Sequence, residues 1–216
     1  MGGGLIEWVR QFYNYNEPYS YEMIEKDALG SSLGAGGLIF LPYLLGERMP
    51  VWDSNVRSAF WGLERFHTRR EMTRAVLEST GFIALDMMRS VEKIGVNISD
   101  IRFSGGLSRI DLVSQIKADI TNRKILVLSD HETTAIGAAM LVLTGQKIIP
   151  SWTKAVECFV SIRMIAYPNK KNHEKYLEVF KLYKNLYAVT KNLFAEQRMH
   201  LIKNVLEKQD TKIEKL

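Results

Sequence analysis

The feature that most constrains the fold is an alternation of strand and helix patterns in the middle of the chain. Short apolar runs typical of buried strands are each followed by a loop and then by a helical pattern, in the order strand 98–103, helix to about 120, strand 124–128 and helix 133–143. Ser108 or Asp111 is expected to cap the first of these helices, and Gly145 to end the second. Such an order predicts an α/β fold.

The first 97 residues are predicted to supply helices, one strand and a long loop. Apolar residues recur at helical spacing at Leu5, Trp8, Val9 and Phe12, directly after a run of three glycines. Further elements are expected in the order short helix 21–29, buried strand 38–41, loop 42–57 and long helix 69–93.

The end of the chain is predicted to be helical, because all 15 glycines lie in the first 145 residues. A short helix is expected to follow residue 150, and a turn to precede residue 170. Beyond that turn, aromatic residues separated by four, three, four and seven positions share one helical stripe, namely Tyr176, Phe180, Tyr183, Tyr187 and Phe194. We therefore expect one domain over residues 1–168 and a helical extension, 169–216, that packs on it.

Composition and charge exclude several classes of protein. The chain has 216 residues, of which 46% are hydrophobic, so a sizeable core is expected and general disorder is not. Its net charge of +5 lies wholly in the last 47 residues, which hold 11 basic and 6 acidic side chains. A lysine-rich helix explains this excess better than a nucleic-acid partner does. A single cysteine and the lack of an 18-residue apolar run indicate a cytoplasmic protein without a membrane partner.

Three local patterns could carry chemistry, and each also has a structural explanation. Paired glycines follow the strand 98–103. They would suit a nucleotide-binding site and an ordinary tight turn equally well. The glycine run before the first helix could expose N–H groups or could be a flexible terminus. Small residues around Gly137 would let a helix approach a ligand or, more commonly, a sheet, so we expect something close to Gly137.

A resemblance connects these patterns. Residues 58–63, seven intervening residues and then 71–78 resemble the C-terminal signature of the FGGY carbohydrate kinases, which include xylulose, gluconate and glycerol kinases. The segment 41–50 resembles a loop of that family. The segments 105–106 with 118–120, and 134–139, resemble its nucleotide-site elements.

The resemblance implies a fold and a division of labour. It implies a ribonuclease-H-like domain of the actin and hexokinase superfamily, with a mixed sheet flanked by helices and a long C-terminal helix. The chain resembles only the second of the family's two domains, while the first holds most sugar contacts and the catalytic aspartate. No residue here is therefore assigned as the general base, including Asp53, Asp111, Asp119 and Asp130.

The resemblance also implies a set of nucleotide contacts, namely Gly3, Glu7, Gly105, Gly106, Ile110 and Asp111. Gly3 and Gly106 would approach the nucleotide through their backbone. Glu7 stands where glycerol kinases have glutamine, and a carboxylate cannot donate as that amide does. Ile110 stands where they have asparagine, and it could only pack against a base or a ribose.

Glu47 and Arg48 match the substrate loop of the sugar kinases in the family. Arg48 could approach a phosphate, or it could form a structural ion pair with Glu47 that holds the loop. The four histidines are expected to be structural or on the surface, His131 in a loop and His173 in the solvated tail. We expect no metal ligated by the protein, since Mg²⁺ would arrive with ATP.

Two functions follow as hypotheses. The first is the ATP-binding half of a kinase that phosphorylates a sugar such as xylulose or gluconate, inactive alone because its N-terminal partner domain is absent. The second is a truncated nucleotide-binding or scaffold protein without kinase activity. In both, the surface that would meet the other domain is expected to favour self-association, for example as a homodimer.

Overall fold

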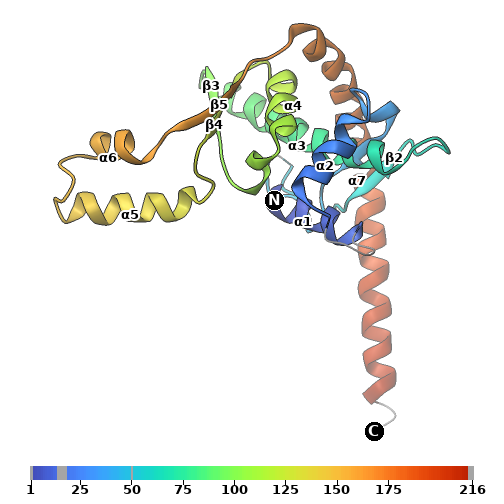
Figure 1. The fold of residues 1–216 in the computed structure, drawn as a ribbon. Helices are drawn as coiled ribbons and strands as arrows, with labels where there is room; N and C mark the ends of the chain where they lie inside the picture. The colour runs from blue at the N-terminus through green and yellow to red at the C-terminus, as the bar shows by residue number, and fades with distance from the viewer. Residues whose placement is uncertain (1, 14–18, 50, 214–216) are drawn as a thin grey trace.

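The computed structural model describes residues 2–13, 19–49 and 51–213. Figure 1 shows a helix-rich body, a pair of helices that projects from it, and a C-terminal helix that runs well beyond it. The elements in chain order are α1 (Gly2–Phe12), α2 (Tyr21–Leu29), η1 (Ala35–Gly37), β1 (Ile39–Leu41), β2 (Ala59–Trp61), α3 (Arg69–Glu92), β3 (Asp100–Phe103), η2 (Gly106–Arg109), α4 (Asp111–Thr121), β4 (Lys124–Leu128), α5 (Thr133–Gly145), α6 (Trp152–Phe159), β5 (Ile162–Ala166) and α7 (Lys170–Ile213).

The central alternation folds as predicted, into a mixed three-stranded sheet with the order β3-β4-β5. β3 is parallel to β4, and β5 is antiparallel to β4. Helix α4 returns the chain between the two parallel strands, which is the connection that parallel strands require. Its Ala118 packs on Ile125, Val127 and Ala166 in a small buried cluster.

Two strands were not anticipated from the sequence. β5 is an edge strand whose residues are mostly exposed, and Arg163 interrupts its apolar residues, whereas β4 has four apolar residues in a row. β2 has only three residues and pairs antiparallel with β1 in a separate sheet, with Phe40 opposite Phe60. β1 is buried at every position, and this explains why its apolar run was recognisable.

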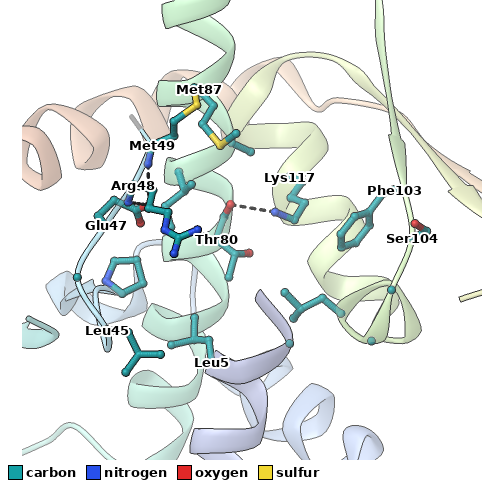
Figure 2. A pocket seen from close by; sticks show the side chains of 18 of the residues that line it. Leu5, Leu45, Glu47, Arg48, Met49, Thr80, Met87, Phe103, Ser104 and Lys117 are labelled. Carbon is teal, nitrogen blue, oxygen red and sulfur yellow. Dashed lines mark hydrogen bonds between the residues drawn. The ribbon is translucent and has the colours of Figure 1, made fainter. Parts of the chain in front are cut away.

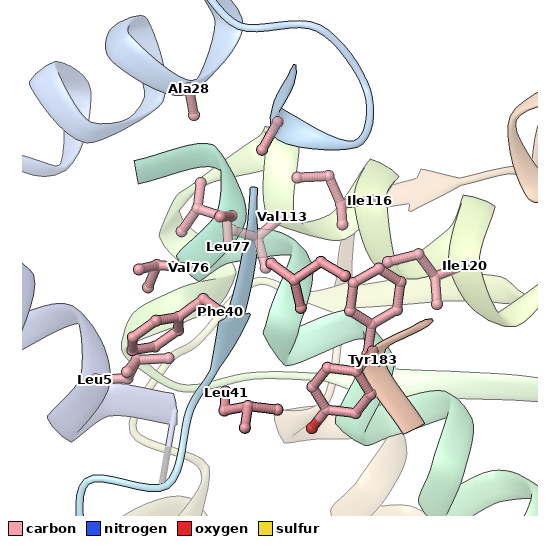
Figure 3. Packing of buried hydrophobic residues seen from close by; sticks show 14 of the residues in the cluster. Leu5, Ala28, Phe40, Leu41, Val76, Leu77, Val113, Ile116, Ile120 and Tyr183 are labelled. Atoms are coloured by element: carbon pink, nitrogen blue, oxygen red, sulfur yellow. The ribbon is translucent and has the colours of Figure 1, made fainter. Parts of the chain in front are cut away.

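Helix α3 forms the centre of the body. Its start is fixed by a capping box in which the Thr68 hydroxyl accepts from the backbone while the Glu71 carboxylate accepts from the Thr68 N–H at 2.8 Å. Leu77 and Val76 of α3 are buried between α2, α4 and β1, as Figure 3 shows. The burial of each such side chain contributes about 1.5–3 kcal/mol.

A buried polar network joins α3 to α7. Glu78 accepts hydrogen bonds from Arg74 Nε at 2.7 Å, from the Tyr176 hydroxyl at 2.9 Å and from the Gly34 N–H at 3.0 Å. Arg74 also donates to the Tyr176 hydroxyl at 2.8 Å. Because the carboxylate is almost wholly enclosed, these contacts take the place of its lost hydration.

Helix α7 carries the predicted aromatic stripe, which is confirmed. Tyr176, Phe180 and Tyr183 are buried against the body, and the Tyr183 hydroxyl lies 2.7 Å from that of Tyr43, which directly follows β1 and Pro42. His173 was expected to be solvated, but its Nδ1 lies 2.9 Å from the carbonyl oxygen of Asp119. Among the described residues, no helix is both long and apolar enough to cross a membrane.

Helices α5 and α6 form the projecting pair, called the arm from here on (Figure 1). The expectation that Gly137 packs closely on a sheet is wrong, because a Cβ placed there would meet no atom of the described chain within 4 Å. Its alternative, a ligand close to Gly137, stays a prediction. Within these two helices only Met140 and Ala155 are buried. The small residues of α5 therefore do not serve close packing within this chain.

Candidate functional site

A cavity of about 930 Å³ lies between α3, α4, the start of α1, the loop after β1 and the turn after β3. Figure 2 shows it from close by, with the loop residues Glu47 and Arg48 facing Phe103 and Ser104 across the space. Five of the eight predicted site residues line this cavity, namely Gly3, Glu47, Arg48, Gly105 and Gly106. The size is within the range of small-molecule sites in proteins.

The turn after β3 presents backbone rather than side chains to the cavity. Gly105 has φ 89° and ψ −175°, a conformation essentially restricted to glycine. Its carbonyl oxygen accepts the Ser108 N–H at 3.0 Å, which closes the turn. A Cβ at Gly106 would lie 3.3 Å from the Tyr21 hydroxyl, so the lack of a side chain matters there too.

The expected helix cap is wrong. Ile110 occupies the N-cap position of α4 and makes no side-chain hydrogen bond there, while Asp111 is already the first helical residue. The Ser108 hydroxyl instead donates to the Gly105 carbonyl oxygen at 2.7 Å and lies 2.8 Å from His131 Nδ1. His131 is therefore half-buried and bonded to the turn instead of being only a surface residue of its loop.

Three predicted nucleotide contacts lie outside the residues that line the cavity. Glu7 is exposed on α1 and forms an ion pair with Arg10 at 3.0 Å. Ile110 is fully buried in the main core. Asp111 accepts a hydrogen bond from Arg163 of β5 at 2.6 Å.

Glu47 anchors the loop through backbone contacts. Its Oε1 accepts from the N–H groups of Arg48 and Met49, at 2.8 and 3.1 Å, and its own backbone pairs with that of Asp53. Of the two alternatives for Arg48, the side-chain ion pair with Glu47 is not formed, and the Arg48 side chain extends into the cavity in Figure 2. Glu47 Oε2 is buried without a hydrogen-bond partner in the described part of the chain.

Lys117 also lines the cavity, although it was not among the residues predicted from the sequence. It projects from α4, donates from Nζ to the Thr80 carbonyl oxygen at 2.9 Å and lies 5.2 Å from the centroid of the Phe103 ring. Burial lowers the pKa of Lys117 to about 8, and no ion pair to a described carboxylate compensates. Its position could have indicated burial, because Lys117 shares a face of α4 with Val113 and Ile120, which are both buried.

Asp119 and Asp53 accept hydrogen bonds that hold the local structure around them. Asp119 accepts from Gln115 Nε2 at 2.7 Å, from the Asn169 N–H at 2.9 Å and from Asn172 Nδ2 at 2.8 Å, which fixes the start of α7. Asp53 accepts from the Asn55 N–H at 2.9 Å within its loop. Among the residues that the structure describes, no group of three or more His, Cys, Asp or Glu side chains could hold a metal ion.

Comparison with known proteins adds the family. The sequence pattern of the FGGY family of carbohydrate kinases, C-terminal domain, matches residues 1–145. A xylulose kinase of Staphylococcus epidermidis is 33% identical over 194 residues, which cover 90% of this chain and 39% of that protein. A gluconokinase of Bacillus licheniformis is 29% identical over 209 residues, which cover 90% of this chain and 40% of that protein. The chain thus spans about two fifths of the length of these curated relatives.

Solved structures agree with this assignment. A ligand-bound xylulose kinase from Lactobacillus acidophilus superposes with a TM-score of 0.78 at 28% identity, covering 90% of this chain and 39% of that one. A gluconate kinase from the same organism gives a TM-score of 0.75 at 29% identity over 87% of this chain and 38% of that one. Sequence pattern, relatives and fold together show that the chain belongs to the FGGY family of carbohydrate kinases and corresponds to its C-terminal domain.

Proposed function

We propose that this chain is the nucleotide-binding part of an ATP-dependent carbohydrate kinase that transfers the γ-phosphate to a hydroxyl of a sugar such as xylulose or gluconate. The observation that carries the proposal is the convergence of Gly3 with Gly105 and Gly106, which are distant from it in the sequence, on one cavity beside Glu47 and Arg48. Residues 1–168 would form the nucleotide-binding unit, and 169–216 its helical extension.

The polar groups of the cavity suit an anionic ligand. A ligand could approach the backbone of the turn after β3 closely, because neither Gly105 nor Gly106 carries a side chain. Arg48 and the buried Lys117 add two cations, and a phosphate chain would supply the counter-charge that Lys117 lacks. Mg²⁺ bound to ATP would neutralise phosphate charge.

The general base is assigned to the rest of the kinase. The cavity-lining residues include one carboxylate, Glu47; its Oε1 is already occupied by two backbone N–H groups of its own loop, and its Oε2 is buried where a substrate hydroxyl would not reach it. In-line phosphoryl transfer depends on positioning, metal and a base that accepts the hydroxyl proton. We therefore expect the 216-residue chain alone to be inactive towards xylulose and gluconate, and to gain activity when joined to an N-terminal kinase domain.

A pair of glycine substitutions tests the nucleotide site. A Cβ at Gly3 or at Gly4 would meet nothing within 4 Å, so valine at either position should leave the fold intact. Gly3 lines the cavity and Gly4 does not. Gly3→Val should weaken ATP binding, measured by titration calorimetry, on the order of tenfold or more, because the new side chain occupies ligand space. Equal binding by Gly3→Val and Gly4→Val would refute the site.

A second candidate function is a nucleotide-binding or scaffold protein without kinase activity. The observation that favours it is the exposed apolar surface of the arm, where Leu141 and Val142 are 65% and 62% exposed. Self-association in sedimentation, together with no ATP-dependent rise in melting temperature, would support the scaffold over the kinase half. We expect a cytoplasmic protein with neither a nucleic-acid nor a membrane partner, since the charge excess is confined to α7.

A further inference from the structure

The glycine turn after β3 depends on one serine for its shape. Ser108 is fully buried, and both its N–H and its hydroxyl donate to the Gly105 carbonyl oxygen, at 3.0 and 2.7 Å. These two bonds orient the peptide that joins Gly105 to Gly106. That peptide lines the cavity, so the direction of its N–H depends on Ser108.

The proton balance at Ser108 defines the role of His131. A serine hydroxyl has one proton, and a carbonyl oxygen can only accept, so that proton is committed to Gly105. The 2.8 Å contact between Ser108 Oγ and His131 Nδ1 must then be a bond that the imidazole donates. Both the neutral Nδ1–H tautomer and the imidazolium can donate it.

A second contact connects the same loop to the other end of the turn. Ser104, the residue before Gly105, has its hydroxyl 3.0 Å from that of Thr133, the first residue of α5. The pairs Ser108–His131 and Ser104–Thr133 are called the brace. Through the brace, His131 of the loop between β4 and α5 and Thr133 at the start of α5 hold the glycine turn at two points.

We propose that His131 is a positioning residue of the nucleotide site. It donates from Nδ1 to Ser108, and Ser108 in turn holds the Gly105 carbonyl oxygen in the orientation that turns the backbone of Gly105 and Gly106 to the cavity. The inference rests on the proposed nucleotide-binding function and extends it to a residue that does not itself line the cavity.

Matched variants of His131 test the proposal. Asparagine can place an amide N–H where imidazole has Nδ1–H, whereas leucine has similar size and no donor. His131→Leu and Ser108→Ala should each weaken ATP binding about tenfold, the value of one hydrogen bond, and His131→Asn should stay within about twofold of the native chain. Melting temperatures should differ little between His131→Leu and His131→Asn. Unchanged ATP affinity in His131→Leu would overturn the proposal.

Amide hydrogen exchange separates failure of this inference from failure of the proposed function. In the ligand-free chain, loss of the bond from His131 to Ser108 should speed exchange of the Ser108 N–H about tenfold in His131→Leu, and His131→Asn should restore its protection. This result would support the brace even if the native chain bound no nucleotide. Equal exchange in the native chain, His131→Leu and His131→Asn would contradict the inference whatever the affinity for ATP.

Discussion

The body and the arm are both rich in apolar residues, but they use them in opposite ways. In the body, residues from α1 to α4, β1 and α7 form one continuous core. In the arm, α5 is apolar around its whole circumference and has no polar face, yet Leu141 and Val142 are mostly exposed. A helix that is apolar on all sides is normally buried. The apolar content of a segment can therefore predict a helix, but it does not indicate what covers that helix.

The largest difference in stability between a body variant and an arm variant is expected when an ion pair is broken in each region. Glu78→Ala would leave Arg74 buried without its partner, so we expect a loss of about 3–5 kcal/mol in the free energy of unfolding by urea. Glu157→Ala in the arm removes a solvent-exposed pair with Lys154 and should cost less than about 1 kcal/mol. Similar losses in the two variants would show that the Glu78 network is not enclosed in solution.

Leucine truncation gives the second contrast. Leu77 is fully buried in the body, and Leu77→Ala should destabilise the chain by about 2–5 kcal/mol because it leaves a cavity. Leu141→Ala in the arm should change stability by less than about 0.5 kcal/mol. A large loss from Leu141→Ala would mean that the arm is covered in solution.

The buried charge of Lys117 should make the stability of the body depend on pH. The pKa of Lys117 is about 8 when folded and 10.5 when free, so between these values the unfolded chain binds more protons and stability rises with pH. Relative to Lys117→Met, the native chain should gain on the order of 2 kcal/mol between pH 7 and 9.5. Parallel stability curves for the two proteins would show that Lys117 is hydrated.

The smallest effect on stability is expected from substitutions on the surface of the arm. Replacing Leu141 and Val142 together by serine should leave the melting temperature almost unchanged, because both side chains already contact water. The same change should reduce self-association in sedimentation at high protein concentration. If the native chain stays monomeric throughout the concentration range, the expectation of a homodimer is wrong.

Local patterns in the sequence predicted most of the fold. The alternation at 98–145 predicted β3, α4, β4 and α5, since each has a clear period or an apolar run. The cap of α4 was wrong because Ser108 lies inside η2, two residues before the N-cap position, while Asp111 is already helical. β2 was missed because three residues are too few to show a strand period, and β5 because Arg163 interrupts its apolar residues.

The candidate site was predictable only where its residues belong to recognisable motifs. The glycines and Glu47 were found in this way, and the structure places them on one cavity. Lys117 and His131 were not found, because their partners Thr80 and Ser108 are 37 and 23 residues away in the chain. Contacts of that kind arise from packing, so no local period could have indicated them.

The hydroxyl pair of Tyr43 and Tyr183 makes the docking of α7 visible by absorbance. Burial raises the pKa of both phenols above the ordinary value of 10.0, so neither ionises in mildly alkaline solution while α7 is in place. Once α7 leaves the body, both phenols regain contact with water and ionise near their ordinary pKa. The growth of tyrosinate absorbance would then report the detachment of α7 in the unlabelled, native sequence.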